Sequence, residues 1–263
     1  GFDILGTTEQ TFPSLTGYIA NPLINIVIML LIVIGGIGFL TWDDFCTNKW
    51  NLKRYRLQSK IILVTTAVLI LLPAIFFFLS DFVGFSMGKR ILASLFQSVT
   101  LRTAGFNTAD LGAMNDSSKA IMTLMMLIGG SPGSTAGGMK TTTIAVLILN
   151  AFATFGREPE TEVFGRRFDN TVVKNAATIA ILYFFLFFAG GIAISQIEHI
   201  ALSDCLFETA SAVGTAGLTL GITTELGLVS HLILVVLMYL GRVGGLTLIY
   251  AAISVKIQSG AKR

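Results

Sequence analysis

One apolar block of this chain is interrupted by the stretch Gly129-Gly130-Ser131-Pro132-Gly133-Ser134-Thr135-Ala136-Gly137-Gly138-Met139-Lys140. The first ten of these residues include five glycines and one proline, and both residue types disfavour the interior of a helix. The whole block, residues 120–153, is longer than a simple membrane span. We therefore predict two helices joined by an irregular loop at residues 129–138.

The composition around this stretch is that of a membrane protein. Hydrophobic residues make up 53% of the chain and charged residues 13%, which is about half the charged share of a soluble domain. Five apolar blocks have the roughly 20 residues that a spanning helix needs. They are residues 22–40, 61–79, 120–153, 172–197 and 228–255. We predict an all-α membrane protein in which the long third and fifth blocks are broken or tilted.

The placement of the basic residues predicts the topology. Basic clusters follow the first, third and fifth blocks, whereas few basic residues lie in the alternate connections. The clusters are Lys49, Lys53, Arg54, Arg56 and Lys60, then Arg157, Arg166, Arg167 and Lys174, and finally Lys256, Lys262 and Arg263. By the positive-inside rule these segments are cytoplasmic. We expect a multi-pass protein of the cell membrane with a cytoplasmic C-terminus, and a net charge of +3 gives no reason to expect nucleic acid.

Internal repeats divide the chain into units. The tripeptides Thr103-Ala104-Gly105 and Thr215-Ala216-Gly217 precede Phe106 and Leu218, and each follows a short semi-apolar stretch, at residues 90–101 and 205–213. Each tripeptide glycine lies 24 residues before a second glycine mark, Gly129-Gly130 or Gly241-Arg242. An earlier span carries the mark Gly35-Gly36, and Gly1 with Phe2 resembles the end of a preceding tripeptide.

The short stretches have too few residues to cross a bilayer, so we expect half-helices that enter the membrane and return. Repeated re-entrant segments imply a shared central path, because irregular backbone at that depth must be buried or line a cavity. The predicted fold is a set of repeated span–pore-loop–span units around a central ion pore, with a broken helix in the third unit. The unit boundaries fall at residues 1–59, 60–171 and 172–263.

The tripeptides have the chemistry of a cation filter. A dehydrated cation needs oxygen ligands, which rings of backbone carbonyls supply, and glycine adopts the dihedral angles that such rings require. A half-helix that ends at the tripeptide also directs its negative end at the ion, and Ser203 and Asp204 are candidate N-cap residues for the second half-helix. The predicted cation ligands are the backbone carbonyls of Thr103, Ala104, Gly105, Thr215, Ala216 and Gly217. The alternative is that these small residues only allow close helix packing.

Four segments resemble the pore-forming subunits of the Trk/Ktr superfamily of potassium transporters: residues 99–110, 129–143, 208–221 and 240–248. The resemblance implies four linked units, each with one filter strand, in which Gly1, Gly105 and Gly217 are the second, third and fourth key glycines. The first unit and most of the second are then absent from this sequence. It also implies that residues 129–138 form an intramembrane gate, that potassium is the substrate and that no cofactor is needed. Its implied partners are a second copy of the chain and a cytosolic nucleotide-binding regulatory subunit.

Several polar residues allow more than one interpretation. Arg242 lies inside a span, where a charge is functional by default; it can act at the gate or simply pair with a carbonyl or carboxylate. Lys140 can extend toward the cytoplasm, and Glu208 can attract cations or bind nearby backbone. Residues 133–141 approach the phosphate-binding pattern G-x-x-x-x-G-K-[ST], but Met139 adds one residue and no strand precedes the stretch.

The sequence leaves two functions open. The first is channel-like potassium uptake, driven by the membrane potential at about 2.3 kcal/mol per charge per 100 mV, with sodium as a second cation that the sequence does not exclude. The second is a sodium- or proton-coupled secondary transporter, which also places unwound glycines at the membrane midplane. An enzyme is not expected, because the chain has no nucleophile–base pair or metal cluster in a recognisable motif.

Overall fold

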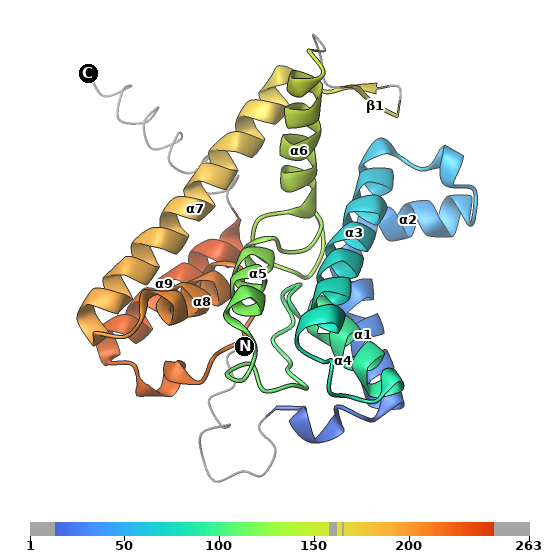
Figure 1. The fold of residues 1–263 in the computed structure, drawn as a ribbon. Helices are drawn as coiled ribbons and strands as arrows, with labels where there is room; N and C mark the ends of the chain where they lie inside the picture. The colour runs from blue at the N-terminus through green and yellow to red at the C-terminus, as the bar shows by residue number, and fades with distance from the viewer. Residues whose placement is uncertain (1–13, 158–161, 165, 245–263) are drawn as a thin grey trace, which may run out of the picture.

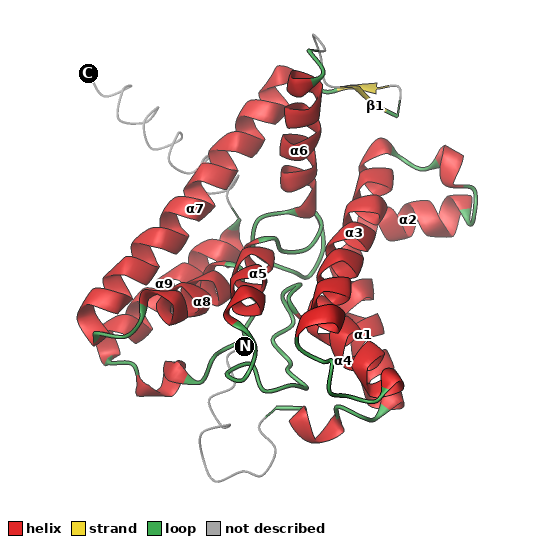
Figure 2. Cartoon of the chain, viewed as in Figure 1, coloured by secondary structure: helices red, strands yellow, loops and turns green. Residues whose placement is uncertain are grey.

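The computed structural model of this chain describes residues 14–157, 162–164 and 166–244, and these residues are almost entirely helical (Figure 1, Figure 2). Within these ranges the strands are β1 (Glu162–Val163) and β2 (Arg166–Arg167), which pair antiparallel. Short 3-10 helices lie at Thr16–Tyr18, Leu52–Arg54 and Ile222–Glu225. The all-α prediction is confirmed.

Two helices are long and apolar enough to cross a membrane alone, α3 (Leu57–Ser80) and α7 (Asn170–Glu198). Their 24 and 29 residues correspond to about 36 and 44 Å at the α-helical rise, which exceeds the roughly 30 Å of a hydrocarbon core. They match the second and fourth predicted blocks within a few residues at each end.

The first block differs from the prediction, because it is not one span over residues 22–40. It forms α1 (Pro22–Ile37) and α2 (Phe39–Asn48), which meet at an angle of 95°. Gly38 joins them with φ of 93°, a left-handed conformation that glycine adopts readily. A Cβ at this position would lie 2.6 Å from the carbonyl oxygen of Pro132, so the bend is set by close packing against the 129–138 loop.

The third and fifth blocks are divided or shortened. The third forms α5 (Asp116–Leu127) and α6 (Thr141–Phe155), and the predicted loop lies between them. The fifth forms α9 (Leu228–Val243), which ends before Gly244 at φ of 86°. The remainder of that block lies outside the described residues.

The short stretches form half-helices, α4 (Met87–Thr100) and α8 (Leu202–Val213). Their 14 and 12 residues extend for about 21 and 18 Å, too little to span a membrane. α4 packs against α3, and α8 packs against α7 and α9. The predicted N-cap of α8 is wrong: the cap residue is Ala201, and Ser203 donates its hydroxyl to Asp204 instead.

The helices form two groups with irregular chain between them (Figure 1). α1 to α4 make up one group, and α7, α8 and α9 make up the other, with α5 between the two. The loops that follow α4 and α5 run through the centre (Figure 2). The hydrophobic core includes Phe77, Met122, Met126, Ile194 and Phe207, which are fully buried. The fold therefore brings the glycine-rich segments together inside a helical frame.

Candidate cation pathway

The two tripeptides, called third and fourth after their units, share one backbone conformation, which differs from that of the half-helices before them. Thr103 and Thr215 have φ of 58° and 52°, and Gly105 and Gly217 have φ of 79° and 90°. A threonine at positive φ is a rare and strained state. The same strain at matched positions of both units indicates that the segment geometry is imposed by the fold.

The backbone N–H groups of these segments bond back onto the half-helices. Ala104 N donates to Thr100 O at 3.3 Å, while Ala216 N and Gly217 N donate to the carbonyl and hydroxyl oxygens of Ser211 at 2.8 and 3.0 Å. Within the described residues, no hydrogen bond reaches the carbonyl oxygens of Thr103, Ala104, Gly105, Thr215, Ala216 or Gly217. Among the described residues these carbonyl oxygens can therefore still accept a ligand, and their role as cation ligands stays a prediction.

The tripeptides lie against each other, although 112 residues separate them in the sequence. A Cβ at Gly105 would lie 2.6 Å from Ala216 O and 3.1 Å from the Cα of Gly217. Glycine is therefore required at position 105 for contact as well as for its dihedral angles. Gly1, which the resemblance implies is the key glycine of the second unit, lies outside the described residues.

The 129–138 loop is attached on one side to the end of α1. Ser131 N donates to Gly36 O at 2.9 Å, and Thr135 donates to Gly35 O through its N–H and its hydroxyl at 3.2 and 3.1 Å. Phe39 N donates to Gly133 O at 3.0 Å. The bonds from Ser131 and Thr135 satisfy carbonyls that the end of α1 leaves without partners, and the bond from Phe39 satisfies an N–H at the start of α2. The loop acts as the C-cap of α1.

On its other side the loop contacts α9 and the fourth tripeptide. Gly138 N donates to Gly241 O at 3.1 Å, and a Cβ at Gly138 would lie 2.9 Å from Gly214 O. A Cβ at Gly137 would collide with the side chain of Thr215. The loop thus lies directly beneath the fourth tripeptide, and all three glycine marks found in the sequence contact it or belong to it.

Two basic side chains bind loop carbonyls. Arg242 donates from Nη1 to the carbonyl oxygen of Thr135. This is the paired state that the sequence left open, with a carbonyl of the predicted gate as the partner. Lys140 donates to Ala136 O at 2.6 Å, so its side chain also binds the loop, and its extension toward the cytoplasm stays a prediction. Both cations bind the loop at adjacent residues.

Glu208 holds the segment that follows the fourth tripeptide. It is fully buried and accepts hydrogen bonds from Leu220 N at 2.9 Å and from the hydroxyls of Thr219 and Thr223 at 2.8 Å. Of the two interpretations left open by the sequence, the structure favours the one in which Glu208 binds nearby groups. Glu198 has a similar role for α9, because it accepts from Gly227 N and Ser230 Oγ.

One residue near the site was not identified from the sequence. Arg102, directly before the third tripeptide, is 5% exposed, and its guanidinium has no hydrogen-bond partner among the described residues. The sequence does show a charged residue between the apolar half-helix and the tripeptide, and this feature could have identified Arg102. The matched position of the fourth unit is Gly214, so the repeat pattern does not account for the arginine.

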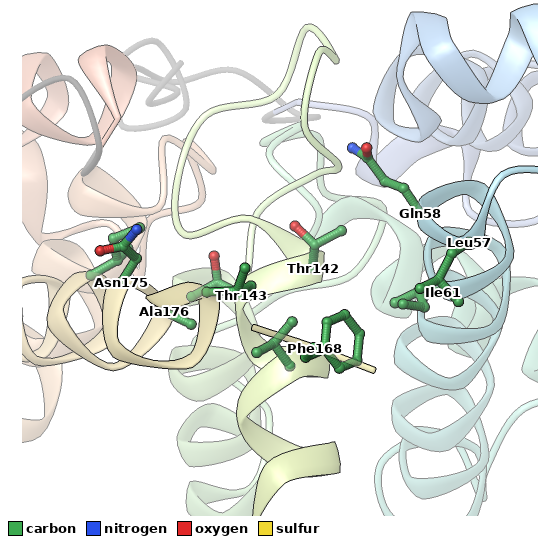
Figure 3. Close-up of a pocket in the computed structure, with 11 residues that line it drawn as sticks. Leu57, Gln58, Ile61, Thr142, Thr143, Phe168, Asn175 and Ala176 are labelled. Atoms are coloured by element: carbon green, nitrogen blue, oxygen red, sulfur yellow. The ribbon is translucent and has the colours of Figure 1, made fainter. Parts of the chain in front are cut away.

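Several cavities lie at or near the loop, and two of them border α7. One of about 280 Å³ is lined by loop residues from Pro132 to Lys140 together with Tyr183, Val243 and Gly244. The other, of about 490 Å³, lies among α3, α6 and α7 and is shown in Figure 3. Its lining includes Ile61, Phe168 and Ala176, and no charged side chain. The first cavity is therefore the better candidate for an ion path past the loop.

Long apolar helices around two half-helices that end at tripeptides, whose carbonyl oxygens accept no hydrogen bond among the described residues, are features of a membrane protein for cation transport. The chain belongs to the TrkH family, described as cation transport protein, whose model matches residues 55–261. The Ktr system potassium uptake protein B of Bacillus subtilis is 33% identical over 90% of this chain and 55% of its own length. The potassium/sodium uptake protein NtpJ of Enterococcus hirae is 35% identical over 95% of this chain and 56% of its own length.

The fold also matches a solved structure. The potassium transporter TrkH from Vibrio parahaemolyticus superimposes with a TM-score of 0.74 at 20% sequence identity, over 92% of this chain and 54% of that one. The chain thus spans about half the length of the curated relatives and of the solved structure that it matches.

Proposed function

We propose that this chain contributes two filter strands and a gate to a potassium uptake pathway across the cell membrane. The third and fourth units, residues 60–171 and 172–263, each provide one tripeptide, and Gly1 belongs to the filter strand of the second unit. The observation that carries the proposal is the contact between the two tripeptides, with their matched positive φ angles and unpaired carbonyl oxygens.

The physical basis is replacement of the hydration shell. A cation that enters the filter loses water and is compensated by carbonyl oxygens held in a fixed arrangement. The half-helices α4 and α8 end at the tripeptides, so the negative ends of their dipoles face the same point. The membrane potential then drives uptake without any further energy source.

The loop at residues 129–138 is the proposed gate. It lies beneath the fourth tripeptide and is bonded to α1 and α9 by a small number of hydrogen bonds. Six of its ten residues are buried, as expected for irregular backbone that is held by the protein around it. Movement of the loop, together with release of Arg242 from Thr135, opens the path in this proposal.

Other parts of the proposal come from the relatives and the charge pattern. The printed name of NtpJ includes sodium, so sodium is a second candidate substrate here. The C-terminus is proposed to be cytoplasmic, because the basic clusters follow alternate spans. A homodimer and a cytosolic nucleotide-binding regulatory subunit are the proposed partners.

Replacement of either filter glycine tests the function. Gly105→Ser and Gly217→Ser place a side chain at φ of 79° and 90°, and at Gly105 also 2.6 Å from Ala216 O. We expect weaker preference for potassium over sodium, and failure to rescue a potassium-uptake-deficient host at limiting potassium.

Gly88→Ser is the matched control. Gly88 lies in the half-helix that precedes the third tripeptide, and a Cβ there meets nothing within 4 Å. This variant is expected to rescue growth as the parent does. Wild-type rescue by both filter variants would contradict the assignment.

A further inference from the structure

Arg102 carries a charge that has no compensation among the described residues. The side chain is 5% exposed, and Nε, Nη1 and Nη2 all lack a hydrogen-bond partner there. A buried charge without a partner is strongly unfavourable. An arginine in this state therefore calls for a second conformation in which its N–H groups are used.

The position of Arg102 identifies the groups it can reach. Its Nη2 lies 4.0 Å from the place that a Cβ would occupy at Gly36, in the last turn of α1. α1 also packs against α4, the half-helix that ends two residues before Arg102. The guanidinium thus lies next to the C-terminal end of α1, the negative end of its dipole, where a cation is favoured.

The carbonyls at that helix end are occupied by the loop. Gly36 O accepts from Ser131 N at 2.9 Å, and Gly35 O accepts from the N–H and hydroxyl of Thr135 at 3.2 and 3.1 Å. If the loop moves away, both carbonyls lose their donors in a largely buried region. Leaving such groups unpaired opposes the movement.

We propose that Arg102 is a positioning residue that binds the Gly35 and Gly36 carbonyls when the loop is displaced. This inference rests on the proposed gate. The planar guanidinium presents several N–H donors in one fork, so it can serve two neighbouring carbonyls. The two α1 carbonyls then always have a hydrogen-bond donor. Ser131 and Thr135 donate to them with the loop in place, and Arg102 donates to them with the loop displaced.

Two arginines therefore have opposite effects on the same loop. Arg242 binds the carbonyl of Thr135 and holds the loop in place. Arg102 has no partner among the described residues with the loop in place, and it gains its partners only when the loop leaves. Removing Arg242 favours the displaced loop, whereas removing Arg102 disfavours it.

The test combines substitutions at both arginines in the protein as the organism makes it. Arg102→Met and Arg102→Lys are made alone and together with Arg242→Ala. Uptake of rubidium into proteoliposomes reports flux. Thiol labelling of Ser134→Cys, in a background without the exposed Cys46, reports displacement of the loop independently of flux. Arg90→Met is the control, because Arg90 lies in the half-helix that precedes Arg102 and binds Phe78 O at 2.7 Å.

We expect Arg102→Met to lower the labelling rate of the Arg242→Ala protein about tenfold, the effect of one hydrogen bond to a charged donor. Arg102→Lys should restore part of the rate, and Arg90→Met should leave it unchanged. Flux should change in parallel with labelling. Membrane abundance of Arg102→Met should equal that of the parent, because no bond of the present state is lost.

Three results would overturn the inference. The first is labelling that does not respond to Arg102→Met in either background. The second is a loss of abundance that Arg102→Lys does not repair, which would indicate a structural partner for the arginine. The third is a labelling rate that rises with Arg102→Met. If instead labelling follows the expectation while flux does not, the proposed gate fails and the role of Arg102 in loop position stands.

Discussion

Replacement of Arg242 by alanine is the most direct test of the gate. The substitution removes the hydrogen bond from Nη1 to Thr135 O and leaves the other loop contacts, those with Gly35, Gly36 and Gly241, in place. A hydrogen bond to a charged group contributes about 1.5–3 kcal/mol. Because the Arg242 side chain is exposed within the described chain, solvent competes for it and the lower end applies.

This loss is large enough to change the population of the loop. About 1.5 kcal/mol corresponds to roughly a tenfold change in an equilibrium constant. A loop that is displaced about 1% of the time would then be displaced about 10% of the time. We therefore expect rubidium uptake by Arg242→Ala proteoliposomes to rise up to about tenfold and to depend less on the proposed regulatory partner.

Arg242→Lys serves as the matched control. Lysine keeps the charge but lacks the planar fork of donors, so an intermediate flux is expected. The reasoning would be refuted if Arg242→Ala abolished flux while membrane abundance stayed unchanged. The segment would then be a binding site, and the coupled secondary transporter would become the better interpretation.

Two further predictions concern the loop and the topology. Gly137→Ala should raise flux, because its Cβ collides with Thr215 of the fourth tripeptide and displaces the loop. Gly133→Asn should leave flux unchanged, because the space at Gly133 is open and asparagine tolerates its positive φ. Rubidium uptake at equal abundance measures both, and unchanged flux in Gly137→Ala would contradict the obstruction. Cysteines at Asn51 and Phe164, both exposed, should react only from the cytoplasm and one at Asn115 only from outside; exchange of sides in impermeant-thiol labelling would overturn the charge argument.

Much of the fold follows from local sequence. Glycine content alone predicted the break at residues 129–138, because no helix of ordinary stability accommodates five glycines and a proline in ten residues. The matched tripeptides predicted the unusual backbone at Gly105 and Gly217, and both have positive φ. Spans and half-helices were predicted from apolar length, a property that each segment carries by itself.

The features that sequence did not predict depend on contacts between distant segments. The bend at Gly38 is required by the carbonyl of Pro132, 94 positions away, and nothing near Gly38 indicates that neighbour. The acceptor for Arg242 was predicted only as some carbonyl or carboxylate, because its identity depends on how the loop folds back. The state of Arg102, without a partner among the described residues, is likewise a property of the packed structure.

The glycine marks show how a repeated frame carries a single, asymmetric loop. At the matched register the third unit has Gly130, where a Cβ would lie 2.8 Å from Ser134 Oγ and 3.2 Å from Gly36 O. The fourth unit has Arg242 at that register, and its side chain reaches the loop from outside. A side chain would be excluded at position 130 by the same loop that binds the side chain at position 242. The difference between these two positions therefore follows from the loop. It explains why the third and fourth units have the same spacing from tripeptide to glycine mark but different residues, Gly130 and Arg242, at the matched position.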